Sequence, residues 1–231
     1  MMRRLDQLLS NLGYCSRRGA RDFLRSHNVV ADGIAIADAS TKVAHSSVQV
    51  DGQPLDHPDG ILAMLNKPAG LVCSHDPSEG PSVYSLLPER WRNRSPQATT
   101  IGRLDKETSG LLLITDQGSL VHRLTSPKHH VVKRYRAHVD RTLPTSLIDL
   151  FSEGQLMLEG ERSPCAPARL EIIGEREALL ELTEGRYHQV RRMFASQGIT
   201  VLALHRESFG GLALGDLAPG NWRELPLSHF G

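Results

Sequence analysis

The sequence predicts an α+β protein in which a small N-terminal domain precedes a larger one. Its 231 residues suffice for one large domain, or for a medium domain with a small one attached. Apolar residues make up 39% of the chain, enough for a core of ordinary size. Stretches typical of strands alternate with helical patterns without a regular βαβ period, and this irregular order favours α+β over a doubly wound sheet.

The small domain is predicted to span residues 1–57. Leucines from Leu5 to Leu12 follow the i, i+3, i+4, i+7 spacing of a helix, and Gly13 is placed to end it. A second helix is expected from Ser16, its N-cap. Asp-Gly pairs predict a hairpin at 29–34 and the end of a strand at 48–52, because both positions of such a turn need positive φ. The second helix is expected to bury Ala20, Phe23 and Leu24.

Residues 58–60 are expected to link this domain to a larger one at 61–231, since Pro58 and Gly60 lie in a polar setting. Apolar runs predict strands at 61–65, 111–114, 131–139, 178–183 and 200–205. Helical patterns cover 147–153 and 187–197, and the second ends before Gly198.

Two basic segments stand out although the formal net charge is only +1. Residues 1–27 hold six Arg against two Asp, a local net of +4 (6 − 2). Residues 121–138 contain Arg and Lys and no acid. One such segment is commonly a solvated face, but two separated ones suit a phosphate backbone and favour an RNA partner. The basic residues of the second segment are Arg123, Lys128, Lys133, Arg134 and Arg136.

Cysteine usage and hydropathy indicate a cytoplasmic protein with no membrane partner. Cys15, Cys73 and Cys165 are far apart and form no CxxC pair, so neither a zinc site nor a disulfide framework is indicated. No apolar run resembles a signal peptide or a membrane span. His129-His130 does not predict a metal site, because adjacent strand residues point to opposite faces.

Residues 102–113 form the most informative segment. Asp105 follows Arg103 by two residues in a polar loop, and a small-residue turn is expected at Ser109-Gly110 before a buried strand. A rigid strand can position such a loop, and a neighbouring cation favours the ionised carboxylate. A surface turn carrying an ordinary Arg and Asp remains the alternative.

This segment resembles the G-R-L-D-x-x-[ST]-[ST]-G-L-[LIV]-[LIV] signature of RNA pseudouridine synthases. Three further segments resemble the same family in the same order: Asn66–Gly70 its N-K-P-x-G, Lys133–Tyr135 its K-x-Y, and Glu184–Met193 its E-G-R-x-H-Q-[IV]-[KR]-R-M. The resemblance implies a mostly antiparallel mixed sheet flanked by helices, with a central cleft. Residues 1–57 resemble the S4 RNA-binding domain, with matches at Arg4, Leu5, Asp6, Leu9, Gly13, Ser16, Arg17, Ala20 and Gly33.

The resemblance also implies roles for five residues at the catalytic site. Asp105 corresponds to the nucleophile, and Arg191 to a cation that pairs with it. Arg103 resembles the residue that fills the space left by the flipped base, and Tyr135 the residue that stacks on the uracil. Leu204 corresponds to an apolar pocket wall, although a core leucine is an equal alternative. The residues expected to contact RNA are Arg4, Arg17, Arg18, Arg21, Arg25, Lys133 and Arg186.

Isomerising uridine to pseudouridine breaks the N1–C1′ bond, turns the uracil and rejoins it through C5. Since nothing is oxidised and no group is transferred, no cofactor and no metal is expected. Whether Asp105 attacks C1′ or C6, or acts through a glycal, stays open.

The pattern most resembles family members acting on small-subunit ribosomal RNA, which implies uridine 516 of 16S RNA in a partly assembled subunit, and a monomeric enzyme. Large-subunit members often carry long basic C-terminal tails, whereas this chain ends at Gly231. A large-subunit enzyme and a non-catalytic assembly factor remain alternatives. The presence of Asp105, Tyr135 and Arg191 disfavours the second, and the arginines of the N-terminal domain disfavour a nucleoside hydrolase.

Overall fold

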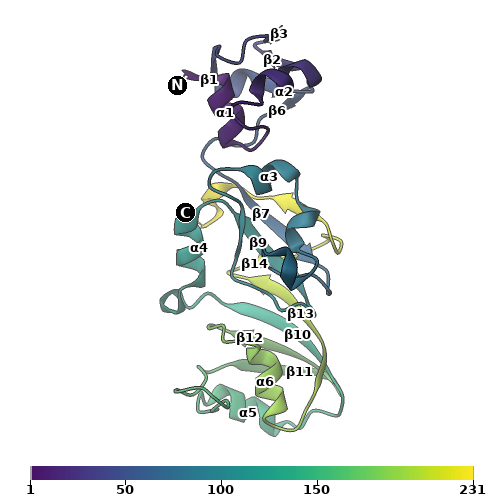
Figure 1. Cartoon of the computed structure of the whole chain (residues 1–231). Coiled ribbons are helices and arrows are strands. Elements are labelled where there is room, and N and C mark those ends of the chain that lie inside the picture. The colour runs from purple at the N-terminus through teal and green to yellow at the C-terminus, as the bar shows by residue number, and fades with distance from the viewer. Residues whose placement is uncertain (1, 231) are drawn as a thin grey trace.

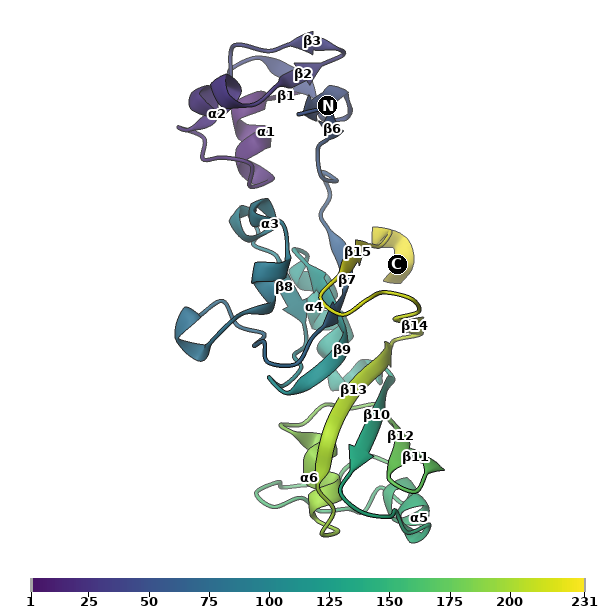
Figure 2. The same ribbon diagram turned by 90° about the vertical axis from the view of Figure 1, so that its right-hand side faces the viewer.

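The computed structural model describes residues 2–230 and is elongated (Figure 1). A small domain, purple in Figure 1, lies at one end, and the larger domain extends from it as a single long sheet with helices on its faces. The view turned by 90° shows the same separation, with one extended segment joining the two parts (Figure 2).

The small domain contains two helices and two short sheets around a core of its own. Leu5, Leu8, Leu9 and Leu12 pack against valines of the strands, so the predicted first helix and its buried face are confirmed. The strands pair as β1-β4 and in the order β3-β2-β5-β6. The elements are β1 (Met2–Arg4), α1 (Leu5–Asn11), α2 (Ala20–Ser26), β2 (Val29–Ala31), β3 (Ile34–Ala35), β4 (Lys42–Ala44), the 3₁₀ helix η1 (His45–Ser47), β5 (Val48–Val50) and β6 (Gln53–Pro54).

Both Asp-Gly turns are confirmed, with φ of 51° and 78° at Asp32 and Gly33 and similar values in the second pair. The second helix begins at Ala20 and not after Ser16. The Ser16 hydroxyl accepts a hydrogen bond from Gly19 N at 3.1 Å within a turn that precedes the helix. Arg17 and Arg18 therefore lie in a turn, and only Arg21 and Arg25 lie on the helix.

The large domain is built on a nine-stranded sheet whose main order is β11-β12-β10-β13-β9-β7-β15. Only the β9/β13 pair is parallel, which confirms the mostly antiparallel mixed sheet. Its strands are β7 (Leu62–Lys67), β8 (Thr99–Ile101), β9 (Thr108–Thr115), β10 (Lys133–Val139), β11 (Arg169–Gly174), β12 (Glu177–Leu182), β13 (Val201–Phe209), β14 (Leu212–Ala213) and β15 (Trp222–Glu224). Its helices are α3 (Glu89–Asn93), α4 (Gly118–Thr125), α5 (Ser146–Ser152) and α6 (Gln189–Ala195), with short 3₁₀ turns η2 (Pro77–Glu79), η3 (Val83–Leu86), η4 (Pro127–His129) and η5 (Leu227–Phe230).

The two halves of this sheet are buried differently. Strand β7 is buried along its whole length, because side chains on both of its faces enter hydrophobic clusters. In β10, by contrast, Tyr135, Ala137 and Val139 are buried while the alternate residues are not. The strands around β10 therefore have one covered face and one that meets solvent.

All five strands and both helices predicted in the large domain are present, with bounds shifted by a few residues. Three local expectations were wrong. Ser109-Gly110 is not a turn but part of β9, where a Cβ on Gly110 would lie 2.3 Å from the Arg206 carbonyl oxygen of the adjacent strand. The helix expected from residue 187 begins at Gln189, because His188 has a left-handed conformation with φ of 49°. The His129-His130 pair lies in and after η4, not on a strand.

Polar contacts connect the two domains where the chain passes between them. Asp56, 8% exposed, accepts hydrogen bonds from Arg90 at 2.8 Å and from Trp91 Nε1 at 3.0 Å. Arg94 pairs with Asp56 and with Asp116 of the large domain. The division into 1–57, 58–60 and 61–231 stays a prediction, and these contacts indicate that Asp56 contributes to the packing of the large domain.

Among the described residues, no helix combines the length and the apolar character needed to cross a membrane. Cys165 is buried, Cys15 and Cys73 are half-buried, and all three are free.

Candidate active site

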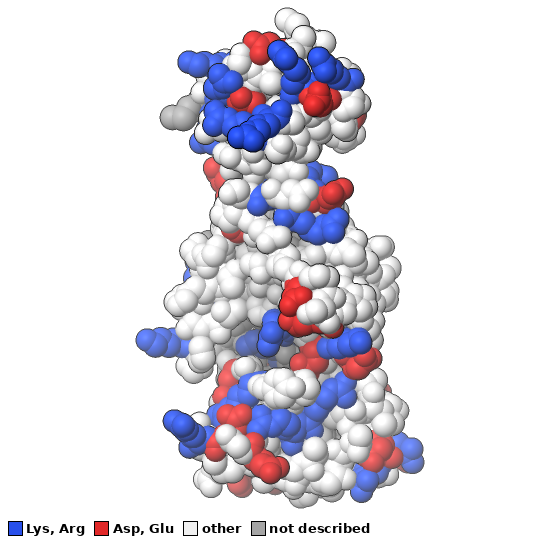
Figure 3. All heavy atoms as spheres, in the orientation of Figure 1, with Lys and Arg blue, Asp and Glu red and all other residues white. Residues whose placement is uncertain are grey.

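A cavity of about 190 Å³ opens in the middle of the large domain, between the loop before β9 and strands β10, β12 and β13. A single bound water needs roughly 10 to 15 Å³ of such space, so the cavity can hold a group much larger than a water molecule. Figure 3 shows the molecule hollowed at this level, with basic and acidic side chains at the rim. The predicted residues Arg103, Asp105, Tyr135 and Leu204 all line it.

Asp105 lies in a loop whose backbone is stabilised by hydrogen bonds from Lys67. Lys67 is completely buried at the end of β7, and its ammonium donates to the carbonyl oxygens of Asp105 at 3.1 Å and Thr108 at 2.8 Å. Its ammonium also donates to the carbonyl oxygen of Lys106 in the same loop and to that of Pro68, which follows Lys67 in the chain. Burial lowers the pKa of Lys67. A single cation therefore organises the backbone from Asp105 to Thr108, while the Asp105 carboxylate remains 34% exposed.

Arg191 forms no ion pair with Asp105 among the described residues, so the structure does not show the expected pairing. Arg191 does not line the cavity, and its guanidinium donates to the carbonyl oxygens of Val201 at 2.8 Å and Glu107 at 3.3 Å. The basic group nearest Asp105 is His188, whose Nε2 lies 3.5 Å from Asp105 Oδ1. Arg191 therefore reaches the loop two residues beyond the carboxylate and contacts its backbone instead.

The floor of the cavity comes from β10, β13 and β9. Tyr135 and Arg206 are cross-strand partners, and Leu204 is paired with Thr108 on β9. Tyr135 and Leu204 are 9% and 4% exposed, so each offers only one edge to the cavity. Arg103 lies at the rim and is exposed.

A polar network shapes the wall formed by residues 184–189. The Glu184 carboxylate accepts hydrogen bonds from Gln189 Nε2 at 2.7 Å and from Arg186 Nε at 3.2 Å. Arg186 also donates to the Ser163 carbonyl at 2.7 Å and lies 3.5 Å from Glu161. Arg186 was expected to contact RNA, but its guanidinium is already engaged within the protein.

The second basic segment is neutralised by acids that are distant in sequence. Arg136 on β10 lies 2.6 Å from Glu207 and 2.7 Å from Glu177. Arg134 has Glu171, Glu181 and Glu207 within 3.8 Å. The expectation that this segment forms an unpaired basic patch was therefore wrong for these two arginines. Lys133 differs, since it lines the cavity and has no acidic partner within 4 Å among the described residues.

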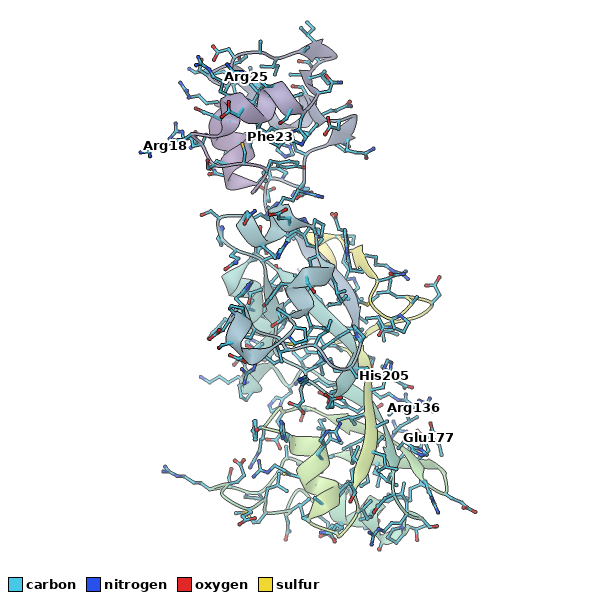
Figure 4. All side chains as sticks on the ribbon, turned by 45° about the vertical axis from the view of Figure 1, so that its right-hand side comes forward. Arg18, Phe23, Arg25, Arg136, Glu177 and His205 are labelled. Atoms are coloured by element: carbon cyan, nitrogen blue, oxygen red, sulfur yellow. The ribbon has the colours of Figure 1, made fainter. Side chains whose placement is uncertain are left out.

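The arginines of the small domain divide into paired and unpaired groups. Arg4 binds Asp6 through two nitrogens, at 2.8 and 3.1 Å, and Arg17 lies 3.7 Å from the same carboxylate. Arg25 contacts the exposed Asp22 at 3.2 Å. Arg18 and Arg21 have no ion pair with any described residue. Arg18 points away from the domain in Figure 4, and Figure 3 shows basic atoms gathered over this part of the molecule.

Four further residues at the site were missed from the sequence: Lys67, Thr108, His188 and Arg206. Lys67 follows the apolar run 61–65 and Asn66 at the end of a strand whose residues are all buried, and that apolar run was a signal that this lysine would be buried. Arg206 gave no local signal, because its burial depends on the packing of three strands. The described residues contain no group of three or more His, Cys, Asp and Glu side chains that could hold a metal ion.

Comparison with known proteins agrees with this geometry. A family model described as RNA pseudouridylate synthase matches residues 61–196, and one described as S4 domain matches residues 3–48. The chain is 40% identical over 229 residues to ribosomal small subunit pseudouridine synthase A of Vibrio parahaemolyticus, covering 96% of this chain and 95% of the relative. It is 40% identical over 227 residues to the protein of that name from Escherichia coli strain K12, covering 96% of each.

A solved structure described as a pseudouridylate synthase superposes with a TM-score of 0.67 at 34% identity, over 97% of this chain and 96% of that one. The family match covers more than half of the chain, and the full-length relatives share its two-domain span. The chain belongs to the RNA pseudouridylate synthase family, carries an S4 domain at its N-terminus, and is a pseudouridine synthase, an isomerase.

Proposed function

We propose that this enzyme converts one uridine of small-subunit ribosomal RNA, at the position equivalent to uridine 516 of 16S RNA, into pseudouridine with Asp105 as its nucleophile. The observation that carries the proposal is that Asp105, Tyr135 and Leu204 line one cavity. The names of the full-length relatives support the small subunit as the source of the RNA.

The cavity requires the target base to leave its stack before reaction. A flipped uracil would lie against Tyr135, whose ring supplies contact area, with Leu204 as an apolar wall. In this proposal, Arg103 at the rim enters the position that the base leaves. Lys67 keeps the loop in one conformation, so that Asp105 meets the ribose with little reorganisation.

Arg191 acts in this proposal as a support for the loop, and not as an ion pair of Asp105. Its contact with the Glu107 carbonyl joins α6 to the segment that carries the nucleophile. Removing the guanidinium would loosen that segment and lower the rate without changing the charge next to the carboxylate. Arg191→Lys, whose shorter reach still allows one contact, is expected to retain part of the activity.

The S4 domain supplies affinity in this proposal. Arg18 and Arg21 are exposed and free of acidic partners among the described residues, as phosphate contacts require. Such contacts set register and add little sequence information, so the choice of uridine depends on the RNA fold that reaches the cavity.

The test is to incubate the protein with naked 16S RNA, with partly assembled small subunits, and with 23S RNA. Pseudouridine is then mapped by primer-extension stops after carbodiimide treatment. One modified position in small-subunit RNA is the expected result. Modification confined to 23S RNA would make this a large-subunit enzyme. RNA binding without modification would indicate an assembly factor, and release of free uracil would indicate a hydrolase.

A further inference from the structure

The cavity that contains Asp105 carries more positive than negative charge. Its ionisable walls include Arg103, Lys133, Arg186 and Arg206 against Asp105 and Glu184, a formal net of +2 (4 − 2) without His188. Arg186 and Glu184 neutralise each other at 3.2 Å. The excess therefore rests on the other three cations, two of which lie on the floor.

Arg206 is the least solvated of these cations. It is 2% exposed, and it lies on β13 between Tyr135 of β10 and Gly110 of β9. Its Nε donates to the Leu111 carbonyl at 2.7 Å, but its Nη2 is buried and has no hydrogen-bond partner among the described residues. No described carboxylate lies within 4 Å of it. The guanidinium carbon also lies 5.1 Å from the centroid of the Phe209 ring, a cation–π contact that compensates part of its burial. Because Nη2 still lacks a hydrogen-bond partner, a ligand that offers an acceptor there would complete the site.

Two further donors lie on the same floor. Lys133 donates to the Val131 and Glu184 carbonyls at 3.1 and 3.4 Å. Burial lowers the pKa of Lys133, and repulsion from the nearby charge of Arg206 lowers it further. Thr108, 1% exposed, has a buried hydroxyl without a hydrogen-bond partner in the described chain.

The reaction produces a negative charge in the place that these groups surround. When the N1–C1′ bond breaks, its electron pair stays with the uracil and spreads over N1 and the ring carbonyl oxygens. Donors aimed at developing charge in a dry site are typically the largest single source of rate acceleration.

We infer that Arg206, assisted by Lys133 and Thr108, binds the carbonyl edge of the flipped uracil and stabilises the negative charge that develops on the ring. This inference rests on the proposed function and identifies a group that acts on the base, whereas Asp105 acts on the sugar. Uracil presents carbonyl acceptors to these donors, whereas cytosine presents its amino group at one of these positions, so the same contacts select uracil.

In the route through C1′, each bond that forms accompanies one that breaks. Asp105 bonds to C1′ while the uracil departs with the electron pair of the N1–C1′ bond. After the ring turns, C5 uses that pair to bond to C1′, and Asp105 leaves with its own electrons. The C5 proton is then lost and N1 gains one, so uridine and pseudouridine differ only in connectivity. Arg206 remains protonated throughout.

The first test compares single-turnover rates and RNA affinities of the wild type, Arg206→Met and Arg206→Lys. Arg136→Met, on the opposite face of the same sheet, is the control. We expect Arg206→Met to react roughly 10²- to 10³-fold more slowly, as for loss of one such donor, with RNA affinity within about threefold of wild type. Arg206→Lys is expected to recover part of the rate, and Arg136→Met to react normally. Thermal unfolding of each variant verifies that it is folded.

The second test uses an RNA whose target base is a better leaving group than uracil. RNA with 5-fluorouridine at the target position yields a more stable uracil anion, and N1–C1′ cleavage is followed in a single turnover. We expect the defect of Arg206→Met to shrink at least about tenfold with this RNA, because less stabilisation is needed. Thr108→Val, which is nearly isosteric, is expected to show a smaller defect with the same dependence, and it replaces Arg206→Met if that variant does not fold.

Three results would overturn the inference. Equal defects on both RNAs would mean that Arg206 only supports the fold. A normal rate with weaker RNA binding and a reduced salt dependence would mean that Arg206 contacts a phosphate of the target nucleotide. Equal rates for wild type and Arg206→Met would remove the residue from the reaction. A wild type that modifies no ribosomal RNA would instead overturn the proposed function, and this inference with it.

Discussion

The two faces of β10 and β13 use arginine in opposite ways. On the solvent face, Arg136 lies between Glu177 and Glu207 at 2.7 and 2.6 Å. On the cavity face, Arg206 is 2% exposed and has no acidic partner among the described residues. Figure 4 shows Arg136 and Glu177 next to each other at the edge of the large domain, near His205, which is the cross-strand partner of Arg136 on β13.

The difference separates cations that stabilise the sheet from cations kept for a ligand. Exposed ion pairs between strands contribute little, about 0 to 1 kcal/mol each, and their loss is tolerated. A buried cation without a partner destabilises the fold, and it persists only where function requires it. The same distinction applies in the small domain, where Arg4 is paired with Asp6 and Arg18 is not.

Asp105→Asn should abolish pseudouridine formation without destabilising the fold. Losing a covalent nucleophile costs roughly 10³-fold or more in rate. The carboxylate is one-third exposed and its ion pair within 4 Å is with His188, so the free energy of unfolding should change by less than about 0.5 kcal/mol. Single-turnover pseudouridine formation and thermal unfolding measure the two effects. Turnover near the wild-type rate would remove Asp105 from the chemistry.

Lys67→Met should lower activity and stability together, because four carbonyl groups lose their donor. We expect a loss of about 2 to 4 kcal/mol in unfolding free energy and roughly 10²-fold in rate. Denaturant unfolding and single-turnover rates measure them. Lys106→Met, an exposed change in the same loop, is the control. A Lys67→Met variant as stable as wild type would show that the Lys67 hydrogen bonds do not stabilise the loop.

The double variant Arg18→Gln/Arg21→Gln should weaken RNA binding about tenfold at moderate salt while the single-turnover rate at saturating RNA stays unchanged. Each lost phosphate contact is expected to reduce the slope of log K against log salt by about 0.7 to 0.9. Filter binding over a salt series measures both. The pair Arg169→Gln/Arg176→Gln, at the far edge of the sheet, removes the same charge. Equal slopes in the two double variants would mean that the small domain contributes only general charge.

Arg136→Met should leave the pseudouridine rate within about twofold of wild type and lower the unfolding free energy by less than about 1 kcal/mol. The side chain is 42% exposed, and both of its partners remain accessible to water. A rate loss as large as that expected for Arg206→Met would mean that arginines on the solvent face matter to the reaction as much as Arg206 does.

His205 on the solvent face should make stability weakly dependent on pH. Burial lowers the pKa of His205 from 6.5, Glu207 opposes the shift and Arg136 adds to it, while Nδ1 lies 2.9 Å from the Ser109 hydroxyl. Because the folded state disfavours the protonated ring, its contribution is present above about pH 6.5 and is lost as pH falls through the lower, folded-state pKa. Denaturant unfolding between pH 5 and 7.5 should show a smaller loss at low pH for His205→Asn than for wild type. His138→Asn, exposed on the same strand face, should behave as wild type.

Local sequence patterns predicted much of the secondary structure. Helical spacing identified α1, Asp-Gly pairs identified both hairpin turns, and apolar runs identified β7, β9 and β10, since each depends on neighbours within a few positions. Segments with weak local signals, such as β15 and α3, were missed because packing against the rest of the sheet stabilises them. The nucleophile proposed here came from a motif and not from periodicity.

The sequence by itself determined the fold class, the family and the loop that carries Asp105, because these depend on local pattern and on motifs in a fixed order. Tertiary structure alone decided which charges of the large-domain sheet and of the Asp105 loop find partners. Arg136 meets Glu177 and Glu207 at separations of 41 and 71 residues, Lys67 reaches carbonyl groups about 40 residues away, and Arg191 contacts Glu107 O instead of Asp105. Strand register and burial create these contacts, and neither is encoded within a window of neighbouring residues.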